Sequence, residues 1–284
     1  MRCFLALLAI FVSAPVLTYA QESPKVTETY GSGPKVFSLA TGSPGELGLL
    51  KQLGEAFARK AGASMEWYKA GTGQSLDMLK ARKVDMVMVH APAKVDQAVK
   101  EGWGVKKTLI GSNEFFIVGP ASDPSGIAMA KTGVQAYQDA AKGKAPFFSR
   151  GDNSGTHQKE MAIWKAAGIE PSGPWYIVTK DFMTATLKRA ENEQGYFMTD
   201  SSTWVAEKTN TPKLKVLFSG DKMLVNTYHA LGQPKGATPG AETAAAFIDF
   251  VASDEGQNII RAYGKDKYGE SLYNDAAYAK KYDD

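Results

Sequence analysis

Short, mostly apolar runs alternate along the chain with longer stretches in which apolar residues recur at helical spacing. Three of the runs are typical of buried strands: residues 36–40, 64–68 and 84–89. The stretches between them predict helices: residues 47–61, with Leu49, Leu50, Leu53 and Phe57 on one face, and residues 75–82. Strands that alternate with helices in this order favour an α/β fold with a mostly parallel sheet and helices on both faces.

Three loops that contain glycine follow predicted strands and precede predicted helices: residues 41–45, 71–74 and 149–157. The third leads from Phe147-Phe148 into a predicted helix over 158–167, with Met161 and Trp164 on one face. Parallel sheets bind ligands at the carboxyl ends of their strands, and a helix start offers unpaired N–H groups and a partial positive charge. The loops therefore predict an anion site. For each loop alone, ordinary helix capping by Ser or Thr is the alternative.

The composition narrows the class of protein. The chain has 284 residues, of which 44% are apolar and 22% are charged, enough for one large or two modest domains. Its formal charge is only +3, and it has no basic stripe with interleaved aromatic residues, so a nucleic-acid partner is not expected.

Residues 1–20 have the order of a secretory signal peptide. Arg2 precedes a mostly apolar run shorter than the ~18 residues of a membrane span, and we expect cleavage near Gln21. A retained membrane anchor is the alternative. Cleavage removes Arg2 and the only cysteine, Cys3, and lowers the formal charge from +3 to +2. A secreted chain that can form no disulfide fits the bacterial periplasm better than a eukaryotic secretory route. The polar, aperiodic residues 21–33 are expected to form a flexible tail.

The third loop carries a full positive charge at Arg150, whose planar guanidinium matches the oxygens of a tetrahedral or carboxylate anion. Asp152 would repel an anion, so we expect it to orient Arg150, with capping of backbone N–H groups as the alternative. Helix capping alone requires neither Arg150 nor the glycines at 151 and 155. The unit Arg-Gly-Asp-x-Ser-Gly-Thr therefore favours ligand binding.

Four segments match a known family: residues 69–76 (KAGTGQSL), 84–92 (VDMVMVHAP), 115–120 (FFIVGP) and 149–157 (SRGDNSGTH). With these motifs the chain resembles the tungstate-binding proteins of bacterial ABC importers, from about residue 37 to residue 268. The resemblance implies a type II periplasmic binding protein, in which crossover strands join two α/β lobes and an oxyanion lies in the cleft between them.

The same resemblance places the crossovers near Phe115-Phe116 and near residues 228–230. Lobe 1 is then residues 34–115 with 229–284, and lobe 2 is residues 116–228. The implied ligand is a small, fully ionised oxyanion, tungstate or molybdate, and the implied partner is the importer's permease. A monomer with no metal or cofactor is expected. Sulfate or a small organic carboxylate on the same scaffold is the alternative ligand.

A more distant similarity to periplasmic phosphate-binding proteins concerns the third loop and the strand over 84–89. Those proteins share the pattern matched here by Arg150, Asp152, Ser154, Gly155 and Thr156. They also place an aspartate before Ala-Pro, where it accepts the proton of hydrogen phosphate; this chain has His90 there. A neutral imidazole lacks that fixed negative charge, which disfavours phosphate and favours tungstate, molybdate or sulfate. A buried His90 without ligand contact is the alternative.

Two segments depart from the tungstate-binding pattern. Residues 40–44 carry fewer hydroxyl side chains than the family's first loop, and residues 180–184 read Lys-Asp-Phe-Met-Thr where the family has Gly-Gln-Gly-Met-Gly. Phe182 with Trp175 and Tyr176 would form a wall for a small organic anion. Packing of these aromatic residues in the lobe core is the alternative.

The residues expected to contact the ligand are Thr41, Ser43, Thr72, Gly73, His90, Arg150, Ser154, Gly155 and Thr156. No catalytic residue is expected, because the sequence around Ser154 lacks the Gly-x-Ser-x-Gly turn that exposes a nucleophile. The three histidines, His90, His157 and His229, are too scattered to form a metal-binding motif.

Overall fold

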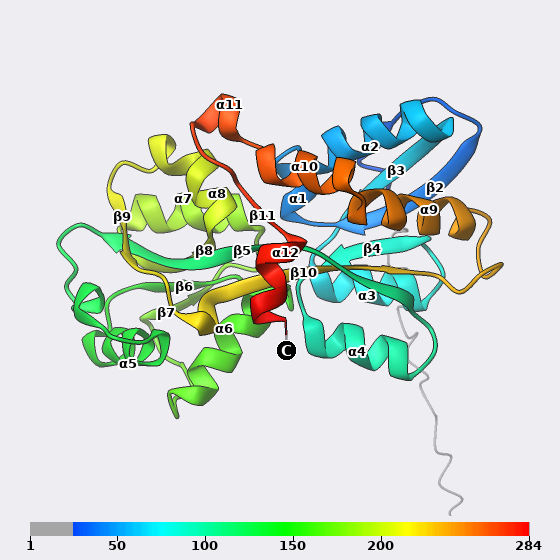
Figure 1. Ribbon diagram of the computed structural model, residues 1–284. Coiled ribbons are helices and arrows are strands. Elements are labelled where there is room, and N and C mark those ends of the chain that lie inside the picture. The colour runs from blue at the N-terminus through cyan, green and yellow to red at the C-terminus, as the bar shows by residue number, and fades with distance from the viewer. Residues whose placement is uncertain (1–24, 284) are drawn as a thin grey trace, which may run out of the picture.

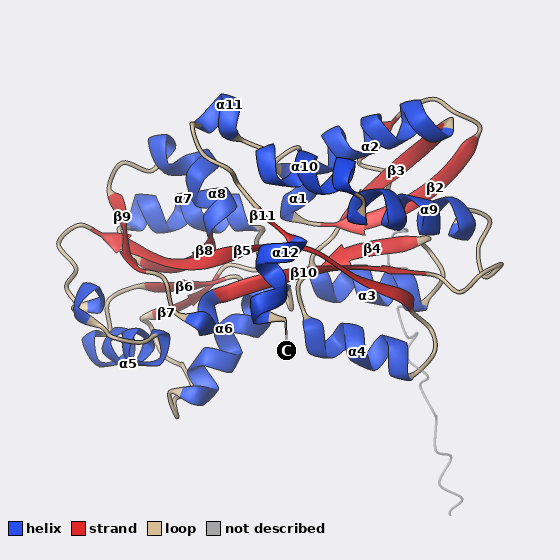
Figure 2. Ribbon diagram, in the orientation of Figure 1, coloured by secondary structure: helices blue, strands red, loops and turns tan. Residues whose placement is uncertain are grey.

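Two α/β lobes lie side by side in the computed structural model of this protein, which describes residues 25–283 (Figure 1). In each lobe, helices cover both faces of the sheet (Figure 2). The predicted signal peptide over 1–20 lies outside the described residues, as do the first residues of the predicted tail. Within residues 25–283, no helix combines the length and apolar character needed to cross a membrane.

Three parallel strands form the centre of the lobe 1 sheet: β2 (Lys35–Thr41), flanked by β3 (Ala63–Lys69) and β4 (Met86–Val89). They confirm the three strands predicted from apolar runs. The helices of this lobe are α2 (Leu49–Ala61), α3 (Thr72–Lys80), α4 (Pro92–Lys100), α9 (Ala241–Ala252) and α10 (Asp254–Ala262). The helix predicted over 47–61 is α2. The one predicted over 75–82 is α3, which begins earlier and has Thr72 and Gly73 in its first turn.

Lobe 2 repeats this arrangement, with β6 (Phe147–Ser149) parallel to β7 (Tyr176–Val178) and β8 (Tyr196–Asp200). Its helices are α5 (Gly133–Gly143), α6 (Gly155–Ala166), α7 (Met183–Glu193) and α8 (Ser201–Glu207). The helix predicted over 158–167 is α6, which begins at Gly155. Its two expected face residues differ in burial, since Trp164 lies in the core whereas Met161 is 38% exposed.

Two long antiparallel strands, β5 (Val105–Pro120) and β10 (Val225–Gly232), cross between the lobes. The first part of β5 pairs with β10, and its last part pairs with β8 and with β9 (Leu214–Phe218). β10 also pairs with β4, which makes the sheet continuous across both lobes. The predicted parallel pairs thus lie at the centre of each lobe, and the crossover strands add antiparallel pairs that the strand–helix repeats did not predict.

The remaining elements are short: α1 (Ser43–Glu46), α11 (Lys265–Tyr268), β11 (Asn274–Asp275), α12 (Ala276–Ala279) and 3₁₀ turns at Ile127–Met129, Lys208–Asn210, Lys222–Leu224 and Lys280–Tyr282. β11 pairs with β5, and α12 lies over the crossover strands (Figure 1).

The prediction of a flexible tail over 21–33 is wrong for part of that segment. Residues Glu28–Tyr30 form strand β1, which pairs antiparallel with the outer edge of β3. Tyr30 is only 3% exposed because it packs in the lobe 1 core. A strand this short is too brief to show the two-residue alternation that identifies longer strands.

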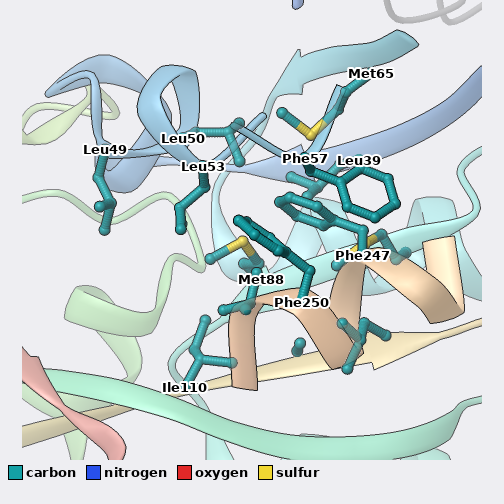
Figure 3. Close-up of a cluster of buried hydrophobic side chains, with 14 of the residues drawn as sticks. Leu39, Leu49, Leu50, Leu53, Phe57, Met65, Met88, Ile110, Phe247 and Phe250 are labelled. Carbon is teal, nitrogen blue, oxygen red and sulfur yellow. The ribbon is translucent and has the colours of Figure 1, made fainter. Parts of the chain in front are cut away.

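Each lobe has a core of its own. In lobe 1, Phe57 of α2 and Phe247 of α9 pack on Phe37 of β2, with ring centroids 5.8 and 5.3 Å away. Leucine and methionine side chains from the sheet and from α2 complete this core (Figure 3). In lobe 2, Trp164 packs edge-on against Tyr137, with ring centroids 4.4 Å apart. The space between the lobes therefore belongs to neither core.

Candidate functional site

A small cavity of about 10 Å³ lies between the lobes, at the carboxyl ends of β2, β3 and β4 on one side and of β6 and β7 on the other. Its lining residues are Thr41, Gly42, Ser43, Pro44, Glu46, Gly71, Thr72, Met88, His90, Arg150, Ser154, Phe182 and Tyr228. A wider groove of about 780 Å³ on the outer face of lobe 1, between α2 and α10, is lined by solvent-exposed charges and brings no buried charge to its wall.

The start of α3 forms part of the lobe 1 wall. Its N-cap is Gly71, which has no side chain to accept a hydrogen bond from the first turn. The first N–H groups of a helix have no acceptor within the helix, and together they carry a partial positive charge. Because Gly71 and the buried Thr72 both line the cavity, this helix start is placed to receive an anion.

The start of α6 forms the facing wall in lobe 2. Ser154 is its N-cap, and the Ser154 hydroxyl accepts a hydrogen bond from the backbone N–H of His157 at 3.3 Å. The Nδ1 atom of His157 in turn accepts from the backbone N–H of Asn153 at 3.0 Å. Both side chains therefore organise the loop, and their geometry is not that of a nucleophile with its base. Within residues 25–283, no group of His, Cys, Asp and Glu could hold a metal ion.

Arg150 brings a nearly buried positive charge, 4% exposed, to this wall. Its Nη2 lies 2.6 Å from Oδ2 of Asp152, and its Nε donates to the carbonyl of Asp181 at 3.1 Å. The other carboxylate oxygen of Asp152 accepts from the N–H of Ser154 at 3.1 Å. The orienting role expected for Asp152 is confirmed, and the capping role considered as its alternative is present as well. The two Arg150 bonds use two of the five N–H donors of the guanidinium.

His90 follows strand β4 and lies at the cavity. Its Nδ1 lies 2.9 Å from Oδ1 of Asn226, and its ring lies against the start of α6, where a Cβ on Gly155 would be 2.4 Å from the ring. Burial lowers the pKa of His90 to about 4, with the charge of Arg150 adding to the effect. The imidazole is therefore neutral at neutral pH, as the comparison with the phosphate-binding pattern required.

A chain of hydrogen bonds leads from His90 into lobe 2. Asn226 donates to Asn113 at 2.7 Å, and Asn113 donates to Ser202 at 2.9 Å and to Asp200 at 3.4 Å. Because the Asn226 amide nitrogen faces Asn113, its oxygen faces His90, so Nδ1 of His90 carries the proton. The crossover strands thus fix the protonation pattern of a residue in the cavity wall.

Asp200 is a buried carboxylate beside the site that the sequence analysis missed. It is 1% exposed and caps α8 by accepting from the N–H of Thr203 at 2.8 Å, and the Ser43 hydroxyl of lobe 1 lies 3.5 Å from its second oxygen. The segment Asp-Ser-Ser-Thr after a buried apolar run is a helix-start signal of the same kind as the three loops that were singled out.

Two hydroxyl groups expected to face the ligand have protein partners. The Thr41 hydroxyl donates to the carbonyl of Met88 at 2.8 Å, and the Ser43 hydroxyl lies beside Asp200. The Thr156 hydroxyl is buried and finds no hydrogen-bond partner among residues 25–283. The first loop therefore offers the cavity mainly its backbone.

Of the expected ligand contacts, six line the cavity and three lie next to it. Those in the lining are Thr41, Ser43, Thr72, His90, Arg150 and Ser154. Those outside it are Gly73, Gly155 and Thr156. Gly73 has another role, since a Cβ there would lie 2.7 Å from the Asn153 amide nitrogen of lobe 2. The missing side chain lets the lobes approach, and the structure has them closed over the cavity.

The aromatic residues considered for an organic-anion wall separate into two groups. Phe182 lines the cavity, whereas Trp175 and Tyr176 pack against the lobe 2 core around Trp164. Core packing, the alternative, therefore holds for two of the three.

Comparison with known proteins assigns a family. A family model described as a PBP superfamily domain matches residues 24–255. The chain is 33% identical, over 273 residues, to the tungstate-binding protein TupA of Peptoclostridium acidaminophilum, across 93% of this chain and 95% of that protein.

Two solved structures support the same family assignment. The tungstate ABC transporter protein of Geobacter sulfurreducens is 36% identical with a TM-score of 0.73, across 82% of this chain and 100% of that one. The tungstate-binding protein TupA of Desulfovibrio alaskensis is 35% identical with a TM-score of 0.69, across 84% of this chain and 98% of that one. These matches confirm the resemblance inferred from the motifs and the two-lobe fold expected from it. The chain belongs to the TupA family of the PBP superfamily.

Proposed function

We propose that this protein is the periplasmic solute-binding component of an ABC importer and that it captures tungstate, or the chemically similar molybdate, between its lobes. The observation that carries the proposal is the closed cavity with Arg150 and the start of α6 on one wall and the start of α3 on the other. The relatives named as tungstate-binding support the choice of anion.

The energetics favour a fully ionised guest. Each hydrogen bond to a charged group contributes about 1.5–3 kcal/mol, so several together offset much of the cost of removing water from a dianion. Arg150 supplies the full charge, while the two helix starts supply donors that need no rearrangement. His90 is neutral and adds no fixed negative charge at the wall, and Asp152 is already paired with Arg150.

Release would require the lobes to separate about β5 and β10, the strands that cross between them. We take the lobes as 34–115 with 229–284 and as 116–228, boundaries that fall within or at the ends of these two strands. The closed form would be recognised by a permease in the membrane. The protein would act as a monomer and carry out no chemistry on its ligand.

A second candidate ligand, sulfate or a small organic carboxylate, keeps some support because Phe182 adds an apolar surface to the cavity. A thermal-shift panel of tungstate, molybdate, sulfate, phosphate and small carboxylates, followed by calorimetric titration of the hits, separates the candidates. We expect tungstate and molybdate to stabilise the protein most. Stabilisation by a carboxylate alone would transfer the assignment to the second candidate.

The variant Arg150→Ala tests the site itself. We expect it to lose anion binding while it stays folded, because the other hydrogen-bond donors of the cavity do not replace a full charge. Unchanged affinity would contradict the assignment of the cavity.

A further inference from the structure

Phe182 lies between two cationic side chains, one from each lobe. The Lys69 Nζ is 4.3 Å from the centroid of the Phe182 ring, and the guanidinium carbon of Arg150 is 5.5 Å from it. Lys69 ends strand β3 of lobe 1, whereas Phe182 and Arg150 belong to lobe 2. A cation over an aromatic face is attracted by the negative charge density of that face. The Lys69–Phe182 contact therefore joins the lobes across the cavity.

Local structure does not account for a phenylalanine at this position. Phe182 is the N-cap of α7 and makes no side-chain cap hydrogen bond. Helices favour Ser, Thr, Asp or Asn there, because these side chains accept a hydrogen bond from the first turn. The contacts of the ring lie across the cavity rather than in the helix.

Lys69 is held in place by a third residue. Its Nζ lies 2.7 Å from Oε1 of Glu46, and Glu46 lines the same cavity as Phe182. An unpaired carboxylate here would repel an anion, and Lys69 neutralises it. Glu46, Lys69 and Phe182 together form what we call the cross-cleft cluster.

We propose that the cross-cleft cluster retains the bound anion: Phe182 seals the cavity once the lobes have closed, and Lys69 holds it there. This inference rests on the proposed function. The Lys69–Phe182 contact spans the two lobes, so opening the cleft breaks it. Its removal therefore favours the open form and speeds release, whereas association with the open form changes little.

The experiment is a measurement of tungstate dissociation and association rates by stopped-flow tryptophan fluorescence. We expect Phe182→Ala to release tungstate about tenfold faster, with an association rate within about threefold of wild type. Phe182→Leu, which keeps an apolar side chain but lacks the ring, should release tungstate at a rate between those of wild type and Phe182→Ala. Lys83→Met, at an exposed lysine outside the cavity, is the matched control and should match wild type.

The role of Lys69 is tested with the paired variant Glu46→Gln/Lys69→Met, which leaves no unbalanced charge. We expect it to speed release about threefold in the wild-type background and to add nothing to Phe182→Ala, because the two act through one contact. Melting temperatures without ligand check that each variant is folded.

Two results would count against the proposal, and a third would count against the proposed function. Release from folded Phe182→Ala at the wild-type rate would overturn the sealing role. Equal effects of the paired variant in both backgrounds would overturn the contact with Lys69. Failure of the wild-type protein to bind any oxyanion would instead refute the proposed function, and with it the ligand that the cluster is said to retain.

Discussion

The Asp152 carboxylate lies 2.6 Å from the Arg150 guanidinium with one oxygen and accepts the Ser154 N–H with the other. A single acidic side chain thus fixes the positive charge of the site and the start of α6. This arrangement explains why an anion site contains an aspartate. The carboxylate acts on the ligand through Arg150.

Replacement of Asp152 tests that relationship. We expect Asp152→Ala to weaken anion binding about tenfold or more, because Arg150 and the loop both lose a partner. Asp152→Asn keeps only one of the two acceptor oxygens and loses the charge, so it should weaken binding by less than Asp152→Ala does but measurably. Calorimetric titration with tungstate measures both, and equal affinities for Asp152→Ala and wild type would contradict the orienting role.

We expect the buried His90 to make the protein less stable in mild acid. Its pKa is lowered by burial to about 4, so the unfolded chain takes up the proton first as the pH falls below 6.5. Stability from the neutral imidazole is present above pH 6.5 and is lost toward pH 4. His90→Asn should remove this dependence, so the wild type should lose about 3 kcal/mol relative to the variant over that range. Urea unfolding at both ends of the range, without ligand, measures the difference; a constant difference would contradict the lowered pKa.

Glu160 should make stability fall as the pH rises, the opposite of the effect of His90. Glu160 is buried in lobe 2, where the Tyr176 hydroxyl donates to it at 2.6 Å and Trp164 at 3.1 Å, and burial raises its pKa to about 7. Its protonated form therefore contributes stability that is complete below pH 4.5 and is lost as the pH rises through 7. Glu160→Gln cannot titrate, so relative to it the wild type should lose about 3 kcal/mol between pH 4.5 and 8. Parallel stability curves for the two proteins would show that Glu160 is ionised throughout.

We expect the substitution Lys180→Gly to stabilise the protein. Lys180 has a φ of 57°, in the left-handed region that favours glycine, and its N–H donates to the Arg150 carbonyl at 2.8 Å. Lys180→Gly relieves the backbone strain of the folded protein but raises the conformational entropy of the unfolded chain. The free energy of unfolding should rise by about 0.5–1 kcal/mol in total. The hydrogen bond to Arg150 is a backbone bond and remains, so tungstate affinity should not change. A lower melting temperature would contradict this account.

The sequence was sufficient for the parts of the site that are local. The loops at 71–74 and 149–157 could be found because glycine, hydroxyl side chains and Arg150 follow apolar runs that form β3 and β6. His90 was singled out because the similarity to phosphate-binding proteins places it where they have an aspartate, after the strand that is β4. The burial that keeps it neutral is a property of the folded protein.

The missed features depend on contacts between distant segments. Asp200 reaches His90 only through Asn113 and Asn226 on the two crossover strands, and no local pattern links these residues. The Thr41 hydroxyl was expected to face the ligand because it belongs to a glycine-containing loop after a strand. Its partner, the Met88 carbonyl, lies on a different strand. Such competition for a hydroxyl proton is decided by strand register, which apolar runs do not specify.

Diffraction at the tungsten absorption edge, from crystals grown with tungstate, tests the central claim most directly. We predict one anomalous peak in the inter-lobe cavity, within hydrogen-bonding distance of Arg150 and of the first turns of α3 and α6. A cavity without that peak, or one filled by an organic compound under the same conditions, would contradict the account.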